Sequence, residues 1–124
     1  PCSMAPHHPD LGFYGVHGLE LLYAFMGPGC TTITRTATKD HDIVTGIWTD
    51  GRVATYRGSR AGTGEFGATV FGSQSNVSTL PYDGYAPMRR EVAKFVRTGV
   101  SPISHEEMLE VIAGVDHHGQ LFAQ

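Results

Sequence analysis

The sequence predicts an α+β domain in which helices pack on one face of a mostly antiparallel open sheet. An apolar pattern of helical period over residues 16–26 precedes several β-branched runs that begin at residue 31. An Asp50-Gly51 pair separates two of these runs, which is typical of a β-hairpin. Two further helical patterns close the chain, so helices and strands are segregated along the sequence, as in α+β proteins.

The first fifteen residues hold three prolines and two glycines, so we expect an extended, loop-like segment there. An apolar stripe of helical spacing then predicts an amphipathic helix over residues 16–26. Gly27-Pro28-Gly29 ends this helix, because Pro28 cannot continue the backbone hydrogen bonding and glycine suits the C-terminal turn. The stripe consists of Val16, Leu19, Leu22 or Tyr23, and Met26.

Strand patterns dominate the middle of the chain. Residues 31–38 are nearly all β-branched, and residues 43–49 and 52–57 flank the Asp-Gly pair. We expect a type I′ turn at that pair, which requires positive φ at both central residues. Further strands are expected over residues 65–71 and 76–80.

Two helices are expected after the strands. The first carries an apolar stripe from Met88 to Val96 and ends at Gly99. Ser104-His-Glu-Glu107 fits a capping box that opens the second. The stripe of the first helix is Met88, Val92, Phe95 and Val96, and the expected buried face of the second is Met108, Val111, Ile112 and Val115.

Composition and charge exclude several classes of protein. Residues 1–124 show no internal repeat or linker and are expected to form one domain, cut from a larger protein. A net charge of −3, with no basic run longer than Arg89-Arg90, argues against a nucleic-acid surface. The longest apolar stretch is too short to span a membrane, and no signal peptide is visible. Cys2 and Cys30 are expected to be thiols in a reducing compartment, the cytoplasm.

The expected sheet has few charges on either face. Residues 31–38 place threonines at alternate positions, so they share one side of the strand. A sheet face of this kind is expected to be covered, by a second copy or a neighbouring domain, and we expect the chain to form a homo-oligomer. The threonines are Thr32, Thr34, Thr36 and Thr38.

The most distinctive feature is a series of segments in order along nearly the whole chain. The first is His8-Pro-Asp-Leu-Gly-Phe-Tyr-Gly-Val-His17-Gly-Leu-Glu20. With the segments that follow it, the chain closely resembles the C-terminal domain of the glucose–fructose oxidoreductase / inositol dehydrogenase (Gfo/Idh/MocA) family. Those segments are Trp48-Thr-Asp-Gly-Arg52, Tyr56-Arg-Gly58, Phe71-Gly72, Tyr85-Ala-Pro-Met88, Phe95-Val-Arg-Thr-Gly-Val-Ser-Pro102 and Ser104-His-Glu-Glu107.

The resemblance implies a two-domain oxidoreductase with an N-terminal Rossmann domain that binds NAD or NADP. The C-terminal domain would supply substrate contacts and, through its open sheet, the oligomer interface. Hydride would pass between the nicotinamide and a carbon bearing a hydroxyl in a sugar or polyol. The family's histidine near the start of the first helix helps handle the hydroxyl proton, and His17 matches it.

Two departures from the family pattern matter. An aspartate commonly stands four residues before the histidine, where this chain has Phe13. The family's Glu-Lys-Pro motif and glycine-rich phosphate loop belong upstream. One G-x-G-x-x-G spacing occurs here, at Gly62-Thr-Gly64-Glu-Phe-Gly67, but a strand pattern and not a helix follows it, so we expect a turn between strands rather than a dinucleotide-binding loop. The chain alone is therefore expected not to catalyse hydride transfer.

His17 is the catalytic candidate, because an imidazole can accept or return a hydroxyl proton. The alternative is a hydrogen-bonded histidine on a helix face. Glu20, one turn later, could orient His17 or contact a substrate hydroxyl, or could be a solvated residue. Tyr14 could lie beside a sugar ring or could hold the preceding segment in place.

A metal site is an alternative for the same region. His7, His8, His17 and Glu20 offer imidazole and carboxylate ligands, but their spacing fits no standard zinc pattern, so no metal is expected. The Asp40-His-Asp42 segment is expected at the surface.

Arginines and the tryptophan have two interpretations each. Arg35, Arg57 and Arg60 could bind substrate hydroxyls or a carboxylate, with Arg57 the candidate we retain, or they could pair with acids such as Glu65. Trp48 is expected in the core or at an interface.

Two functions follow. The first is the substrate and oligomerisation domain of an NAD(P)-dependent sugar or polyol oxidoreductase. The second is a stand-alone binding or assembly module that keeps the sheet interface without enzymatic activity, and the Phe13 departure favours it for the chain as given.

Overall fold

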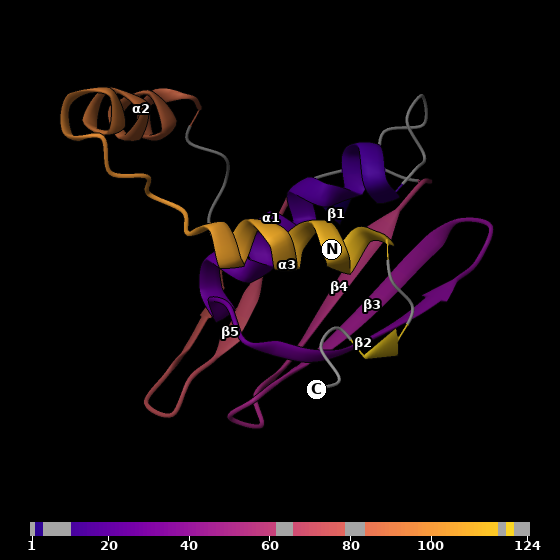
Figure 1. Ribbon diagram of the computed structural model, residues 1–124. Helices are drawn as coiled ribbons and strands as arrows, with labels where there is room; N and C mark the ends of the chain where they lie inside the picture. The colour runs from indigo at the N-terminus through magenta and orange to yellow at the C-terminus, as the bar shows by residue number, and fades with distance from the viewer. Residues whose placement is uncertain (1, 4–10, 62–65, 79–83, 117–118, 121–124) are drawn as a thin grey trace.

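A computed structural model describes residues 2–3, 11–61, 66–78, 84–116 and 119–120. It shows an α+β fold with a mostly antiparallel sheet and with helices packed on one face (Figure 1), which confirms the expected fold class. The main sheet has the strand order β1-β4-β3-β2-β7, and only β1 runs parallel to its neighbour. The strands are β1 (Cys2–Ser3), β2 (Cys30–Ala37), β3 (His41–Trp48), β4 (Val53–Ser59) and β7 (Gly119–Gln120).

A separate two-stranded ribbon and three α-helices complete the described chain. The ribbon pairs β5 (Thr69–Phe71) with β6 (Asn76–Ser78). The helices are α1 (Val16–Met26), α2 (Ala86–Thr98) and α3 (His105–Asp116). The strand expected over residues 65–71 is shorter in the structure, because residues 66–68 are not in a strand. Of the strand expected over residues 76–80, residues 76–78 form β6, and residues 65, 79 and 80 lie outside the described part of the chain.

The core lies between the sheet and a layer formed by α1 and α3. The two helices contact each other, and α1 also contacts β4. Even-numbered residues of β3 and β4, with Ile33 of β2, turn towards the helices because successive side chains of a strand alternate between its faces. Buried hydrophobic residues of this core are Leu11, Leu19, Tyr23, Cys30, Ile33, Val44, Trp48, Tyr56 and Val111.

Residues 11–15 are helical, whereas the sequence predicted a loop-like segment there. They form one π-helical turn that leads directly into α1. Leu11 is only 1% exposed, so its burial anchors this turn against the core. Tertiary packing has outweighed the local preference of the two glycines in this turn.

The ends of α1 and α3 follow the predicted signals. Gly27 adopts φ +67° and donates its backbone N–H to the Tyr23 carbonyl, which closes α1. At the start of α3, the Ser104 hydroxyl accepts the Glu107 backbone N–H at 3.0 Å, as a capping serine does.

The turn between β3 and β4 differs from the expected type I′. Among the described residues only glycines have positive φ, so Asp50 does not, while Gly51 has φ +84°. Gly51 donates to the Trp48 carbonyl, and the Trp48 N–H donates to the Arg52 carbonyl, both at 2.9 Å. This pattern is a type I turn followed by a left-handed glycine, which is the common three-residue hairpin loop.

The helices differ in how far they are buried. Of the four residues predicted on the buried face of α3, Val111 is buried and Val115 is half-buried, whereas Met108 and Ile112 are exposed, so half of the predicted face is wrong. Helix α2 forms where predicted and ends at Gly99 with φ +70°, but none of its residues is buried. Figure 1 shows α2 standing apart from α1 and α3.

The opposite face of the sheet is rich in threonine, as expected. It lies on the side away from α1 and α3. Across the strands it forms rows in which residues of β2, β3 and β4 stand opposite one another: Thr36, Ile43 and Arg57; Thr34, Thr45 and Thr55; and Thr32, Ile47 and Val53.

No described helix is long and apolar enough to cross a membrane.

Candidate functional site

Three of the predicted site residues meet on the exposed side of the first helical segment. Leu11, Leu19 and Tyr23 turn towards the core. Residues three apart on a helix share a face, so Tyr14, His17 and Glu20 come together on the solvent side.

The contacts within this group are direct. His17 Nδ1 lies 2.9 Å from Glu20 Oε2, with the two side chains 53% and 57% exposed. The Tyr14 and His17 rings meet edge to face, with centroids 5.6 Å apart and an interplanar angle of 84°. We call these three residues the Tyr14–His17–Glu20 cluster.

The hydrogen bond determines what the imidazole can do. A carboxylate oxygen only accepts hydrogen bonds, so Nδ1 carries the hydrogen in the pair with Glu20. In the neutral ring Nε2 then has a lone pair and can accept a proton. An exposed base oriented by a carboxylate is the arrangement that general-base catalysis requires.

Phe13, where the family commonly has an aspartate, is 62% exposed. It stands four residues before His17 on the same helical segment, so it shares the face of the imidazole. Its side chain has no polar atom with which to bind the ring or a substrate hydroxyl. Glu20 is therefore the acidic partner of His17 in this structure.

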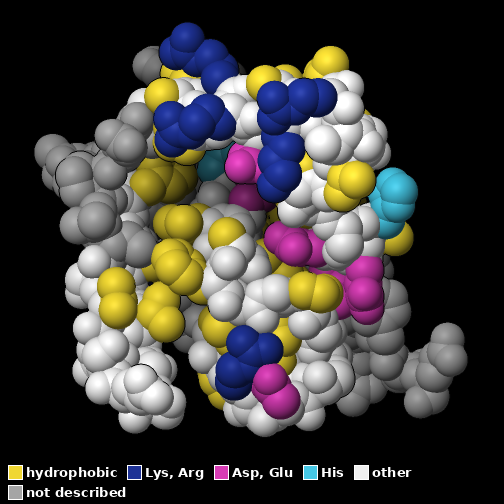
Figure 2. Space-filling model, turned by 90° about the vertical axis from the view of Figure 1, so that its left-hand side faces the viewer, with side chains coloured by type: hydrophobic (Ala, Val, Ile, Leu, Met, Phe, Trp, Pro, Cys, Tyr) yellow, Lys and Arg dark blue, Asp and Glu magenta, His cyan; other side chains and the backbone are white. Residues whose placement is uncertain are grey.

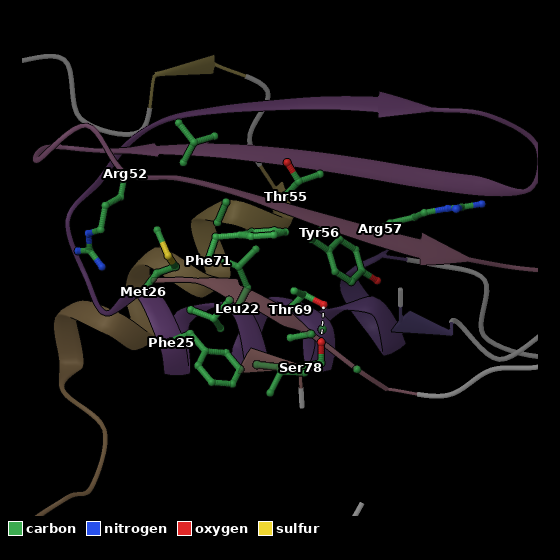
Figure 3. Close-up of a pocket in the computed structure, with 17 residues that line it drawn as sticks. Leu22, Phe25, Met26, Arg52, Thr55, Tyr56, Arg57, Thr69, Phe71 and Ser78 are labelled. Carbon is green, nitrogen blue, oxygen red and sulfur yellow. Dashed lines mark hydrogen bonds between the residues drawn. The ribbon is translucent and has the colours of Figure 1, made fainter. Parts of the chain in front are cut away.

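Arg57 does not join the cluster. It lies on the open face of the sheet, opposite Ile43, and no hydrogen bond or ion pair connects it to Tyr14, His17 or Glu20. It lines one end of a cavity of about 680 Å³ between α1, β4 and the β5–β6 ribbon. In Figure 3 its side chain points away from the middle of this cavity.

The cavity itself is mostly apolar. Leu22, Phe25 and Met26 of α1 face Phe71 of the ribbon across it (Figure 3). Its polar members include Thr69 and Ser78, whose hydroxyls lie 3.3 Å apart, and Arg52, which already pairs with Asp50 at 2.6 Å. Such a lining suits an apolar group better than a sugar.

The other two arginines have a structural partner. Asp42 is fully buried and forms ion pairs with Arg35, at 2.7 Å, and with Arg60. The expectation that Asp42 lies at the surface is therefore wrong. Buried charges are paired because an unpaired carboxylate loses its hydration. Glu65, the acid suggested as a partner, lies outside the described residues.

A second buried carboxylate was not expected from the sequence. Glu110 of α3 is 3% exposed and accepts the backbone N–H groups of Gly29 and Cys30 at 2.8 and 3.0 Å. It thereby fixes the segment that follows α1. No sequence signal indicated this burial, because Glu110 lies on the side of the helix opposite the predicted buried face.

Trp48 and Cys30 belong to the core. The Trp48 indole N–H donates to the Gly27 carbonyl at 2.8 Å, which holds the end of α1 over the sheet. Cys30 is a free thiol, and burial raises its pKa. A buried thiol of this kind is a structural rather than a reactive cysteine.

The described residues contain no group of three metal-ligating side chains. His7 and His8, from the metal alternative, lie outside these residues. His17 and Glu20 bind each other.

Comparison with family models, curated proteins and solved structures returns no match for this chain.

Proposed function

We propose that this chain is the substrate-binding and assembly domain of a cytoplasmic NAD(P)-dependent oxidoreductase that acts on a sugar or polyol hydroxyl. The cofactor would be held by an upstream Rossmann domain, since the G-x-G-x-x-G sequence at residues 62–67 is followed by strand β5 and not by the helix that a dinucleotide-binding loop opens. The observation that carries the proposal is the exposed His17 imidazole, oriented by Glu20 at 2.9 Å. The free thiol of Cys30 agrees with a reducing compartment.

His17 is the proposed general base. Its Nε2 atom takes the proton of the substrate hydroxyl as the C–H bond of the same carbon breaks and a carbonyl forms; in the reverse direction the imidazole returns that proton. The bound nicotinamide supplies the hydride acceptor. Glu20 is a positioning residue, because it fixes the tautomer and orientation of the ring. Tyr14 packs on the imidazole and can present its hydroxyl and ring to a sugar.

Binding can be tested on this chain directly. We expect millimolar myo-inositol or glucose to shift the NMR signals of the His17 ring and of the backbone amides of residues 14–20, and His17→Gln to abolish the shifts of those amides. His105→Gln changes an exposed histidine of α3 outside the cluster and should leave the response intact. Shifts absent for every polyol and sugar tried would exclude a substrate site at this cluster.

Catalysis needs the longer protein. Sequencing the source DNA upstream of the codon for Pro1 should reveal a strand–G-x-G-x-x-G–helix pattern and a Glu-Lys-Pro motif. In that protein, His17→Gln should lower kcat by about 10²–10⁴-fold with little change in KM. Glu20→Gln should lower kcat less and shift its pH profile, as a positioning residue does. An unchanged kcat in His17→Gln would contradict the assignment.

A second candidate function, a stand-alone assembly module, is favoured by the open face of the sheet. Arg57 is the only Lys, Arg, Asp or Glu among the nine residues of its three rows. A face with so few charges suits pairing with the same face of a second copy, giving a homodimer or homotetramer. Thr45→Lys places a charge at its centre and should reduce the mass measured by light scattering. A stop codon just upstream of Pro1 would favour this function over the enzyme.

A further inference from the structure

Helix α2 carries an apolar stripe without a partner among the described residues. Met88, Val92 and Phe95 share one side of the helix and are 55%, 52% and 45% exposed. An isolated helix of 13 residues is marginally stable in water, because most helical stability in proteins comes from packing of the apolar face. The stripe therefore needs a surface to cover it.

A matching surface lies on the outer side of α3. Val111 and Glu110 turn towards the sheet, whereas Met108, Leu109 and Ile112 face away from it and are 48%, 63% and 52% exposed. Helix α3 is thus apolar on two sides. A helix of this kind is usually buried between two layers, and here only the inner layer is present. We call these three residues the outer ridge of α3.

The two helices carry opposite charge. Helix α2 has four basic residues, Arg89, Arg90, Lys94 and Arg97, against the single acid Glu91. Figure 2 shows Lys and Arg side chains gathered at the top of the face on which α2 lies. Residues 105–116, which form α3, contain no Lys or Arg and three acidic residues besides the buried Glu110, and two of these three are in the first turn. Opposite net charges attract two helices and favour their pairing over pairing of like helices.

Within one molecule, the path of the chain keeps the stripe of α2 away from the outer ridge of α3. Residues 99–104 leave α2 in an extended path before α3 begins, and Figure 1 shows α2 projecting to one side of the body. Each copy therefore presents both a stripe and a ridge. Two copies related by a two-fold axis can cover all four surfaces at once.

We propose that two copies of this chain associate by exchanging α2, so that the stripe of each α2 packs antiparallel on the outer ridge of α3 in the other copy. The antiparallel direction brings the basic last turn of α2, with Arg97, near the acidic first turn of α3. This interface lies on the helical side of the sheet. It is thus independent of the open-face pairing considered above, and with that pairing it would generate a tetramer.

Light scattering on the whole 124-residue chain separates the two interfaces. Val92→Glu puts a charge in the stripe and should halve the mass of the assembly. Ala93→Glu adds the same charge to the same helix outside the stripe and should leave the mass unchanged. Thr45→Lys disrupts pairing through the open face of the sheet and leaves the α2 interface unchanged. The masses of the two variants therefore report on the two interfaces separately. An unchanged mass in Val92→Glu would overturn the exchange.

Two further measurements identify the surface that α2 covers. Leu109→Glu, in the outer ridge, should have the same effect as Val92→Glu; if only the α2 variant dissociates, α2 does not bind α3. Amide exchange over residues 86–98 should slow as protein concentration rises. Slow exchange in a monomer would mean that α2 packs on α3 of its own copy. Fast exchange at every protein concentration would mean that α2 packs on no surface of this chain. Either result overturns the proposal.

Discussion

Helices α1 and α2 each carry an apolar stripe of helical spacing, but their surroundings differ. Both are amphipathic and both end at a glycine with positive φ. Helix α1 buries Leu19 and Tyr23 against the sheet and α3, whereas every residue of α2 is exposed. The packed body, formed by α1, α3 and strands β2–β4, is therefore stabilised by its own core. The stability of α2 depends instead on the surface that covers it. The difference shows that helical periodicity predicts a helix but not its partner.

The largest contrast should come from matched leucines in the body and at its outer surface. Leu19 is 2% exposed and Leu109 is 63% exposed, and both are in helices. Leu19→Ala should lower the free energy of unfolding by about 2–5 kcal/mol, because a cavity remains in the core. Leu109→Ala should change it by less than about 0.5 kcal/mol in dilute solution. Urea denaturation of both variants tests this, and equal losses would mean that the outer ridge is covered even in the monomer.

Buried and exposed ion pairs give the next contrast. Asp42 is fully buried with Arg35 and Arg60, whereas Asp50 and Arg52 pair at the surface. Asp42→Asn removes the carboxylate charge that both arginines bind and should lower the free energy of unfolding by about 3 kcal/mol. This is the lower end of the usual range, because both arginines can still reach water. Asp50→Asn should lower the free energy of unfolding much less, because water and salt screen an exposed pair. Chemical denaturation in low salt measures both, and a smaller loss for Asp42→Asn than for Asp50→Asn would refute the argument.

Substitution of two glycines by alanine compares a tightly packed position in the body with an open position outside it. A Cβ on Gly46 would lie 2.8 Å from the Trp48 ring and 3.1 Å from Cys30 Sγ. Gly46→Ala should therefore destabilise the protein by about 1–3 kcal/mol through overpacking. Gly67, beside the β5–β6 ribbon, has nothing within 4 Å of such an atom, so Gly67→Ala should change stability little. Thermal unfolding compares the two, and a tolerated alanine at position 46 would show that the Trp48 ring can move.

The smallest effect concerns alkaline pH. Burial raises the pKa of the Cys30 thiol above its ordinary 9.0 and that of the Tyr23 phenol above 10.0. The unfolded chain releases these protons first, so stability is full below pH 9 and falls as pH rises above about 9. The slope is at most about 1.4 kcal/mol per pH unit for each group.

Tyr23→Phe removes one of these groups and should flatten the fall in stability above pH 10, as measured by urea denaturation at successive pH values. Tyr85→Phe changes a tyrosine that is 62% exposed and should keep the wild-type slope. A slope unaffected by Tyr23→Phe would mean that the phenol ionises equally in both states.

Much of the candidate site followed from spacing. His17 and Glu20 are three residues apart in the helix predicted over residues 16–26, so that helix was enough to place them together, whereas Tyr14 was expected in the loop before it. The segment before Val16 was predicted as a loop, because its glycines and prolines carry no sign that Leu11 is buried. Arg57 was grouped with the cluster, but strand alternation places it on the open face of the sheet.

The sequence by itself determined the local structure: the class of fold, the boundaries of α1 and α2, the serine cap of α3 and the hairpin at Asp50-Gly51. These features depend on residues within a few positions of one another. Only the tertiary structure decided that Asp42 and Glu110 are buried and that α2 is exposed. Those outcomes depend on partners far away in the sequence, such as the backbone of Gly29 for Glu110, and no local pattern encodes which distant surface a side chain will meet.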